Sequence, residues 1–446
     1  MASGVAAQRL KIAFYGDDFT GSTDTLATLS EAGMRAMLFL GVPTAQQLDT
    51  VGALDALGIA GAARSMAPDA MRAELEPVAR FFATLDVPVI HYKTCSTFDS
   101  APHVGSIGAA VEVLRRVVSN PLVAIVGGQP NLGRFCLFAN LFAAVATGGP
   151  VVRIDRHPTM RAHPVTPMLE ADLRVHLAAQ EMSRVVNFAV TNYELSVESQ
   201  NSQLERMLAE RPDAVLFDVG QAAHLPVIGR LIALHAQKAP LLMVGPSGAT
   251  QAMLEHWRHH RQPQRSSSAL DEPLGIAPAR GPVFVLAGSL SPVTARQRET
   301  ASSYLRQPLD AQRVVTHDVA YCGAWIAEVA AHLRAGRNVL AHTSTPAGRV
   351  EIPAADHSLA AQCGELLARL LREVPLQRVG IAGGDTSSHA VRALDIWGLS
   401  HVGTLAPGVA VCRAESHAAH LDGIEFMLKG GQMGPDDLFE RLLRGS

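Results

Sequence analysis

Short apolar runs alternate with amphipathic stretches along most of this chain. Before residue 257 the pattern predicts strands at residues 11–15, 36–40, 57–61, 88–92, 122–126, 185–190, 214–218 and 241–244. Between them it predicts helices at residues 22–33, 104–118, 135–146, 199–210 and 224–236. Apolar strands that alternate with helices are typical of a mostly parallel sheet covered by helices on both faces.

The alternation is interrupted once. Residues 258–281 have no periodicity and are rich in Arg, Gln, Ser and Pro, which predicts a linker. From Pro282 the strand and helix pattern resumes and continues to the C-terminus. We therefore predict an α/β fold with two domains, residues 1–257 and 282–446, each with a mostly parallel sheet flanked by helices.

Three predicted strands run into a Gly-centred polar loop that opens a helix, in the segments Lys11–Ser22, Val283–Ser291 and Val379–Ser388. A helix N-terminus favours an anion because its amides are free and its dipole is positive there, and a glycine lets the backbone approach the ligand closely. Only the first loop carries paired carboxylates. We therefore expect the first loop to carry a metal ion or a catalytic base, and the other two loops to bind a nucleotide.

The acidic loop is the first candidate for catalysis. Asp17 and Asp18 lie in GDDFTGS, beyond the carboxyl end of the first strand, where open α/β sheets bind ligands. Two adjacent carboxylates without a local partner need a cation, a proton or a substrate hydroxyl. Helix capping is the alternative, and it accounts for Ser22 and Asp18 better than for both acids together with two glycines.

Polar side chains also follow two other strands of the first domain. Lys93, Thr94, Cys95 and Ser96 close the strand at 88–92, and a lysine beside hydroxyl and thiol groups suits a polyhydroxylated anion. Arg64 follows the strand at 57–61 and can hold a carboxylate through two parallel hydrogen bonds. The alternatives are an ordinary Ser/Thr turn and a surface arginine.

Residues 153–168 combine prolines, histidines and arginines, which predicts a rigid, non-helical, cationic loop. No histidine pair in it has a recognised zinc-ligand spacing, so contact with an anion or substrate is the expected role.

In the second domain the glycine- and hydroxyl-bearing turns suit phosphate groups, with Ser291 as a helix cap and Pro292 at the first helical position. The candidate nucleotide ligands are Ser289, Gly383, Gly384, Asp385, Thr386, Lys429 and Gly431. The chain contains no Gly-Lys dipeptide and no Gly-x-Gly-x-x-Gly after a strand, which disfavours a P-loop NTPase and a Rossmann dehydrogenase.

Composition narrows the class of protein. A formal charge of −3 without a basic patch argues against nucleic-acid binding. The five cysteines are scattered and the longest apolar runs are too short for a membrane span, so neither a disulfide framework nor a membrane protein is indicated. The N-terminus runs directly into a strand without room for a signal sequence, so we expect a cytoplasmic protein.

Taken in order, the motifs resemble those of the four-carbon acid sugar kinase family over essentially the whole chain. They are the DDFTG opening, the KTCST segment, the HPVTPMLEADL stretch at 163–173, the GS loop at 288–289, the GGDTS turn at 383–387 and the KGGQMG turn at 429–434. The resemblance implies an N-terminal domain that binds a sugar acid and a C-terminal domain that binds ATP with Mg²⁺. It also implies phosphoryl transfer in the cleft between the domains.

The resemblance assigns roles to the candidate residues. Asp17, Arg64 and residues 93–96 would line the sugar-acid site, and the nucleotide ligands would be those named above. Phosphoryl transfer needs positioning, charge neutralisation and one group to accept the hydroxyl proton. We assign that base to Asp17, with Asp18 and Mg²⁺ as helpers and Lys429 or nearby arginines neutralising the phosphates; the metal ligands stay open.

The expected substrate rests on positions at which this sequence differs from other members of the family. CSTFDS at 95–100 has Asp99 where threonate- and erythronate-type members have an arginine, and it is similar to the branch acting on 3-oxo-tetronates. Residues 136–143 and 157–168 suggest a further subgroup, for example one acting on a branched oxo-acid such as 3-oxo-isoapionate. We expect an ATP-dependent kinase that phosphorylates the terminal hydroxyl of a four-carbon acid sugar or its 3-oxo form in carbohydrate catabolism, with a branched oxo-acid such as 3-oxo-isoapionate as the alternative substrate.

Two other functions use the same motifs. A sugar-acid aldolase, isomerase or dehydrogenase would not need ATP, and a non-catalytic sugar-acid-binding protein would leave the phosphate-binding turns idle. The expected ligand in every case is a small sugar acid, and a homodimer is one oligomeric state that the sequence leaves open.

Overall fold

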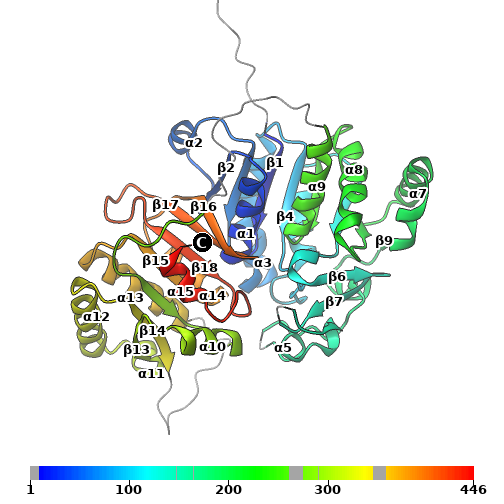
Figure 1. Ribbon diagram of the computed structural model, residues 1–446. Coiled ribbons are helices and arrows are strands. Elements are labelled where there is room, and N and C mark those ends of the chain that lie inside the picture. The colour runs from blue at the N-terminus through cyan, green and yellow to red at the C-terminus, as the bar shows by residue number, and fades with distance from the viewer. Residues whose placement is uncertain are drawn as a thin grey trace, which may run out of the picture. The chain divides into compact units, whose positions relative to one another are not determined.

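The computed structural model describes residues 10–146, 148–163, 165–260, 275–289, 291–344 and 358–445 (Figure 1). Contacts between Cα atoms divide the chain into two compact units, Met1–Ser268 and Ala269–Ser446. Helix α9 continues to His260, three residues into the predicted linker, and residues 261–274 lie outside the described part. The domain limits 1–257 and 282–446 stay a prediction.

The first unit is built on parallel strands in the order β2-β3-β1-β4-β11-β5-β10-β9. Along the chain these strands are β1 Ile12–Gly16, β2 Ala36–Phe39, β3 Ala56–Ala60, β4 Val89–Lys93, β5 Val123–Val126, β9 Val185–Phe188, β10 Ala214–Phe217 and β11 Leu241–Gly245. Every residue of β1, β3, β4 and β11 is buried. Strands without a polar face need cover on both sides, as a parallel sheet provides.

Helices connect these strands. They are α1 Phe19–Glu31, α2 Ala45–Val51, α3 Pro68–Ala83, α4 Ile107–Arg115, α5 Pro158–Arg161, α6 Leu173–Ala178, α7 Val197–Ala209, α8 Leu225–Ala236 and α9 Ser247–His260. In Figure 1, α1, α9 and α8 lie side by side over one face of the strands. The α/β fold and the parallel sheet predicted from the sequence are confirmed, whereas five of these helices have no counterpart among the predicted elements: α2, α3, α5, α6 and α9.

The helix predicted at residues 135–146 is wrong. The segment forms an antiparallel hairpin of β6 Arg134–Leu137 and β7 Asn140–Ala144, extended by β8 Val151–Arg153. Its turn places Phe138 and Ala139 in the left-handed region, with φ of 50° and 66°. The buried carboxylate of Asp218 accepts from both turn amides, at 2.6 and 3.0 Å, and so stabilises a turn that local sequence does not favour.

The second unit contains the parallel strands β13-β14-β12-β15-β18 followed by the antiparallel β17 and β16. In chain order its elements are β12 Phe284–Ala287, α10 Pro292–Thr300, β13 Leu305–Asp310, α11 Ala311–Val315, α12 Val319–Arg334, β14 Val339–Ser344, α13 Ser358–Glu373, β15 Arg378–Ala382, α14 Gly384–Arg392, β16 Gly398–Ala406, β17 Val409–Glu415, β18 Glu425–Lys429 and α15 Leu438–Arg444. One core cluster joins Ile276 and Val285 to Leu442 of α15.

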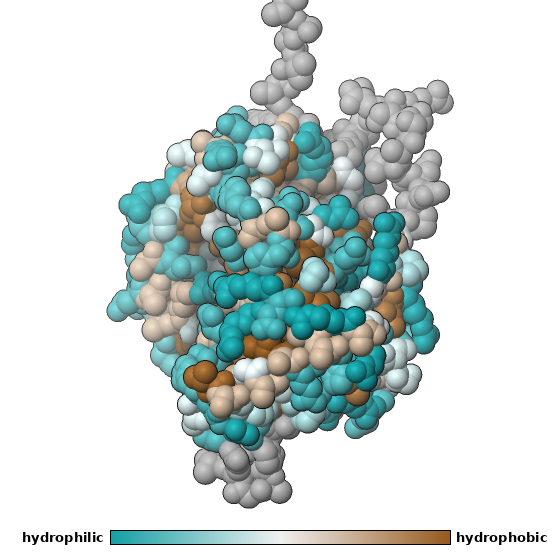
Figure 2. Space-filling view, turned by 90° about the vertical axis from the view of Figure 1, so that its left-hand side faces the viewer, coloured by the Kyte–Doolittle hydropathy of each residue, from teal (hydrophilic) through white to brown (hydrophobic). Residues whose placement is uncertain are grey.

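On the face drawn in Figure 2, hydrophilic residues predominate and strongly hydrophobic ones form small, separate groups. Scattered apolar residues of this kind are ordinary on a water-exposed surface. None of the described helices has the length and apolar content needed to cross a membrane.

Candidate active site

The turn between β1 and α1 holds two buried carboxylates. Asp17 and Asp18 are 4% and 7% exposed. Asp18 is the N-cap of α1, because its Oδ1 accepts from the Gly21 amide at 2.8 Å and its Oδ2 from the Thr20 hydroxyl at 2.7 Å. Sequence analysis suggested Ser22 and Asp18 as caps. Ser22 instead lies inside the helix, where its hydroxyl donates to the Asp18 carbonyl at 2.6 Å.

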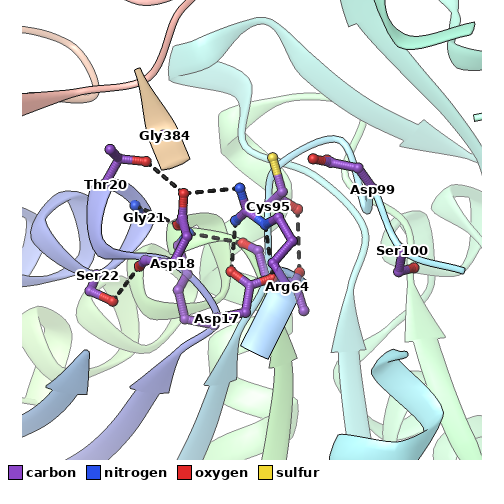
Figure 3. A network of polar contacts seen from close by, with 12 residues as sticks. Asp17, Asp18, Thr20, Gly21, Ser22, Arg64, Cys95, Asp99, Ser100 and Gly384 are labelled. Atoms are coloured by element: carbon purple, nitrogen blue, oxygen red, sulfur yellow. Dashed lines mark hydrogen bonds and ion pairs between the residues drawn. The ribbon is translucent and has the colours of Figure 1, made fainter. Parts of the chain in front are cut away.

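Arg64 supplies the positive charge that the local sequence around the two acids lacks. It lies in the 3-10 turn Ala63–Ser65 after β3. Its Nε and Nη2 donate to Asp17 at 3.2 and 2.6 Å, and its Nη1 donates to Asp18 at 2.9 Å (Figure 3). We expect Arg64 to make a bidentate contact with a substrate carboxylate, but it makes this contact with Asp17. A direct role of Arg64 in substrate binding stays a prediction.

The surroundings separate the two acids chemically. Burial raises the pKa of Asp17 and outweighs the opposing charge of Arg64. Burial also disfavours ionisation of Asp18, but Arg64, Lys93 and the hydrogen bonds from Thr20 and Gly21 hold its pKa below the usual range. A pair of carboxyl groups pushed apart in this way suits one proton-accepting group beside one that stays ionised.

Lys93 completes this charged group. It ends β4, is 3% exposed, and donates from Nζ to the Thr94 carbonyl at 2.8 Å. Its ammonium lies against α1 at Gly21, where a Cβ would be only 2.6 Å from Nζ. The first unit thus brings Asp17, Asp18, Arg64 and Lys93 together, as the strand ends predict.

The loop after β4 adds polar groups next to Arg64. Thr94 is buried, and Cys95 and Ser96 are partly buried. Burial raises the pKa of Cys95 to about 12, so its thiol is neutral and suited to contact rather than nucleophilic attack. Burial opposes ionisation of Asp99 as well, but the charge of Arg64 and hydrogen bonds from Cys95 and Thr97 hold its pKa below the usual range.

The cationic segment 153–168 is only partly as predicted. It contains the 3-10 turn Ile154–Arg156 and the short helix α5, so the prediction of a non-helical loop is wrong. His157 caps α5 by accepting from the Thr159 and Met160 amides. His163 lies close enough to Asp99 for its charge to lower the pKa of that carboxyl, so the segment borders the same group of residues. Contact of this segment with an anion stays a prediction.

Three residues that sequence analysis did not single out form a second polar cluster in this unit. Ser247, at the start of α9, donates to Asp24 at 2.5 Å, and Gln129 Nε2 donates to the same oxygen at 3.1 Å. Gln129 and Ser247 follow the carboxyl ends of β5 and β11. The strand-end rule applied to those two strands would have found them.

In the second unit the three predicted turns meet at one edge, since β12, β15 and β18 are parallel neighbours. A Cβ on Gly288 would lie 2.2 Å from Thr386 Oγ1, and one on Gly431 would lie 2.5 Å from Ser289 Oγ. Gly383 has φ 131° and precedes α14 without any side-chain cap, which leaves amides at the helix start for a ligand.

These contacts bring Ser289, Gly383, Thr386 and Gly431 together, with Gly384 as the first residue of α14. The side chain of Asp385 lies outside the described part of the structure. Ser291 caps α10 by accepting from the Val293 amide at 3.2 Å, and Pro292 is the first helical residue, as predicted.

Lys429 is oriented differently from what we expect of a phosphate ligand. It is fully buried, and its Nζ donates to Thr294 Oγ1 at 2.9 Å, to Gln297 Oε1 at 2.7 Å and to the Gly431 carbonyl at 3.3 Å. Burial lowers the pKa of Lys429 to about 7. Its donors therefore stabilise the turn that carries Gly431, and contact with phosphate stays a prediction.

Two domain models match the chain. Residues 12–253 match a sugar-binding N-terminal domain, and residues 284–439 match a nucleotide-binding C-terminal domain. The chain belongs to the four-carbon acid sugar kinase family. The resemblance stated from the motifs is thereby confirmed.

Relatives within the four-carbon acid sugar kinase family extend over the full chain. A 3-oxo-isoapionate kinase of Paraburkholderia graminis is 37% identical, covering 98% of this chain and 94% of its own. A 3-oxo-tetronate kinase of Cupriavidus necator is 28% identical, covering 100% and 99%. A solved structure from Salmonella typhimurium has the same fold, with a TM-score of 0.77, 24% identity, and coverage of 97% of this chain and 99% of its own.

Proposed function

We propose that this chain is an ATP-dependent kinase that phosphorylates the terminal hydroxyl of a 3-oxo sugar acid, with the branched 3-oxo-isoapionate as first candidate and a 3-oxo-tetronate as second. The two acids of unlike pKa held by Arg64 in the sugar-binding domain are the observation that carries the proposal. The order of the two substrates rests on the identity of 37% to a 3-oxo-isoapionate kinase against 28% to a 3-oxo-tetronate kinase.

In the proposed reaction Asp17 is the base. The substrate hydroxyl oxygen forms a bond to the γ-phosphorus of ATP, the bond from that phosphorus to the bridging oxygen of ADP breaks, and the hydroxyl proton passes to Asp17. A raised pKa makes the carboxylate a better proton acceptor. Asp18 stays ionised and keeps Arg64 in place, so that the guanidinium orients Asp17 through Nε and Nη2.

The proposed nucleotide site is the edge formed by Ser289, Gly383, Gly384, Asp385, Thr386 and Gly431, where backbone amides and hydroxyls can hold phosphate oxygens. Among the described residues no three His, Cys, Asp or Glu side chains gather as a metal site. Mg²⁺ usually needs only one or two carboxylates besides substrate phosphates and waters. The ionised Asp18 is the proposed carboxylate, and the ion would share its oxygens with the present donors Gly21, Thr20 and Arg64. When bound, the ion would neutralise developing charge on the phosphates.

The test is ATP consumption by the purified chain with a panel of acids. The panel contains 3-oxo-isoapionate and 3-oxo-tetronates, generated in situ, together with threonate and erythronate. We expect ADP formation that depends on a 3-oxo acid, and a phosphomonoester signal in the ³¹P spectrum of the product. ATP hydrolysis unaffected by every acid, or an acid-dependent reaction that leaves ATP intact, would contradict the proposal.

A further inference from the structure

The charge of Arg64 is already neutralised within the protein. All three types of nitrogen in its guanidinium donate to Asp17 or Asp18. When both acids are ionised, Arg64 and Lys93 together only balance them. A sugar acid brings one more negative charge, so its carboxylate needs another cation.

Arg134, the first residue of β6, is such a cation. Its Nη1 donates to the backbone carbonyls of Leu132, Gly133 and Ala144, at 2.8, 3.4 and 3.3 Å. Its Nε is buried and has no hydrogen-bond partner. Within the described ranges Arg134 makes no ion pair with a carboxylate. The guanidinium is therefore a partly buried positive charge, and its buried Nε–H is a donor without a partner.

Arg134 belongs to the same group of residues as the candidate active site. Burial lowers its pKa, and the negative charge of Asp99 opposes that shift, so Asp99 lies within electrostatic reach of the guanidinium. The charge of Arg64 acts on the same Asp99. The loop after β4 thus interacts electrostatically with both arginines. Arg64 is paired with Asp17 and Asp18, whereas Arg134 has no carboxylate paired with it in the described ranges.

Gln129 is the backbone partner of Arg134. The amide of each donates to the carbonyl of the other, at 3.0 and 3.2 Å, in an antiparallel bridge. Residues directly opposite in such a bridge project from the same face, with Cβ atoms about 4.5–5.5 Å apart. Gln129 is 1% exposed, and its Oε1 is a buried acceptor without a partner.

The orientation of Gln129 is set by Asp24. Gln129 Nε2 donates to Asp24, which is also held by Ser247, so Oε1 is left as the open end of the amide. Asp24 is three residues after Gly21 and so lies on the same face of α1 as the glycine that contacts Lys93. The unpaired acceptor, Gln129 Oε1, and the unpaired donor, Arg134 Nε, therefore belong to the same polar region as Asp17.

We propose that Gln129 and Arg134 bind the hydroxy-carboxylate part of the sugar acid: Arg134 Nε donates to the carboxylate, and Gln129 Oε1 accepts from a neighbouring hydroxyl. The inference rests on the proposed function for the identity of the ligand class. It moves recognition of the carboxylate from Arg64 to Arg134, and leaves Arg64 to hold the two acids. A buried donor and a buried acceptor on two residues that are paired across one bridge, each without a partner, match a ligand that offers one acceptor and one donor on adjacent carbons.

The test compares Arg134→Met, Arg134→Lys and Gln129→Leu with two exposed controls, Arg80→Met and Gln46→Leu. Each full-length protein is titrated calorimetrically with sodium D-erythronate, sodium L-threonate and the neutral alcohols erythritol and threitol, without nucleotide. The wild type and both controls should bind an acid and prefer it over its alcohol. Arg134→Met should weaken acid binding about 10- to 100-fold and lose the preference, and Gln129→Leu should weaken acid and alcohol alike.

If Arg134→Met does not fold, Arg134→Lys is the second variant, because it keeps a charge and most of the turn contacts. It should still weaken acid binding at least tenfold, because lysine has no Nε–H. Nucleotide affinity should stay within twofold in every variant. Acid binding unchanged in Arg134→Lys and Gln129→Leu, or no acid binding by the wild type, would overturn the inference. Loss of acid binding in the variants of a chain that never consumes ATP would instead uphold this site and refute the kinase reaction.

Discussion

Asp17 and Asp18 are neighbours in sequence with opposite shifts in pKa, so substitutions at the two positions should have different effects. Within the part of the chain that the structure describes, the side chain of Asp17 accepts hydrogen bonds from Arg64 and from no backbone amide, whereas Asp18 caps α1. Replacing Asp17 should therefore affect turnover, and replacing Asp18 should also affect the start of the helix.

At Asp17 we predict that Asp17→Asn lowers kcat by about 10²–10⁴-fold, the usual contribution of a positioned base. The amide is nearly isosteric and keeps one acceptor for Arg64. ATP consumption at saturating acid and nucleotide is the measurement, with Asp49→Asn on exposed α2 as a control. More than about a third of the wild-type kcat would mean that the carboxylate is not the base.

At Arg64 we predict a large loss of stability. Arg64→Ala leaves two buried carboxylates facing each other, and breaking a buried ion pair costs about 3–5 kcal/mol. Urea denaturation should show this loss, and adding Asp17→Asn should recover part of it because one charge is then removed. A loss below about 1 kcal/mol, or no recovery in the double variant, would show that the pairing contributes little.

At Lys429 we predict a pH-dependent stability. The pKa of this buried ammonium is about 7 in the folded protein, against about 10.4 when unfolded, so between these values the unfolded chain binds more protons. Stability relative to Lys429→Met should rise with pH over that interval, by at most about 1.4 kcal/mol per pH unit. Urea midpoints at pH 6, 8 and 9.5 test this; a constant difference would contradict it.

Individual residues also show what the sequence could and could not predict. The strand ends bring Asp17, Lys93 and the turns of the second unit to the positions expected, because parallel strands place their carboxyl ends at one edge. The pairing of Arg64 with the two acids was not visible, since 46 and 47 residues separate the partners. The unpaired atoms of Gln129 and Arg134 likewise depend on packing that no local pattern encodes.

At the scale of the element, the hairpin β6–β7 illustrates the same limit. Its sequence has the apolar content of a helix, and its turn contains neither glycine nor proline. The decisive interaction is the buried carboxylate of Asp218, about 80 residues later, which accepts from the turn amides of Phe138 and Ala139. A tertiary contact thus overrides the local preference, whereas the strands buried on both faces were predictable from their apolar runs.

The turn before α14 gives a prediction about an element. Gly383→Ala places a Cβ at φ 131° and 2.9 Å from Thr386 Oγ1, and such backbone strain costs about 1–3 kcal/mol. Relief of the strain would displace the amides at the start of α14, so KM for ATP should rise about tenfold or more while KM for the acid stays unchanged. Steady-state kinetics with each substrate varied in turn measures both constants.

Gly323→Ala is the matched control for this variant. Gly323 lies within α12, and nothing is within 4 Å of the position a Cβ would occupy there. Alanine is favoured over glycine by about 0.5–1 kcal/mol inside a helix, so this control should be slightly stabilised with unchanged kinetics. Equal effects of the two substitutions would show that the turn at Gly383 is not a nucleotide site.

At the scale of the whole molecule, the two units can be tested apart. We predict that a fragment of residues 275–446 binds ATP but no sugar acid, because the candidate nucleotide ligands all follow residue 288. The fragment begins at 275 because Ile276 is part of the core of the second unit and the Ala279 amide donates to the Leu443 carbonyl. Calorimetry with ATP and with erythronate is the measurement; tight ATP binding by residues 1–260 instead would reverse the assignment.

The hydrogen bond between Asp24 and Ser247 joins residues 223 positions apart. The polar groups of the proposed sugar-acid site thus come from α1 and α9, which lie at opposite ends of the first unit in sequence. On the ribosome this hydrogen bond cannot form until nearly the whole unit has been synthesised. Substrate would then act as a folding ligand of the entire unit, adding RT ln(1 + [L]/Kd) to its stability, and would protect α1 and α9 from hydrogen exchange together.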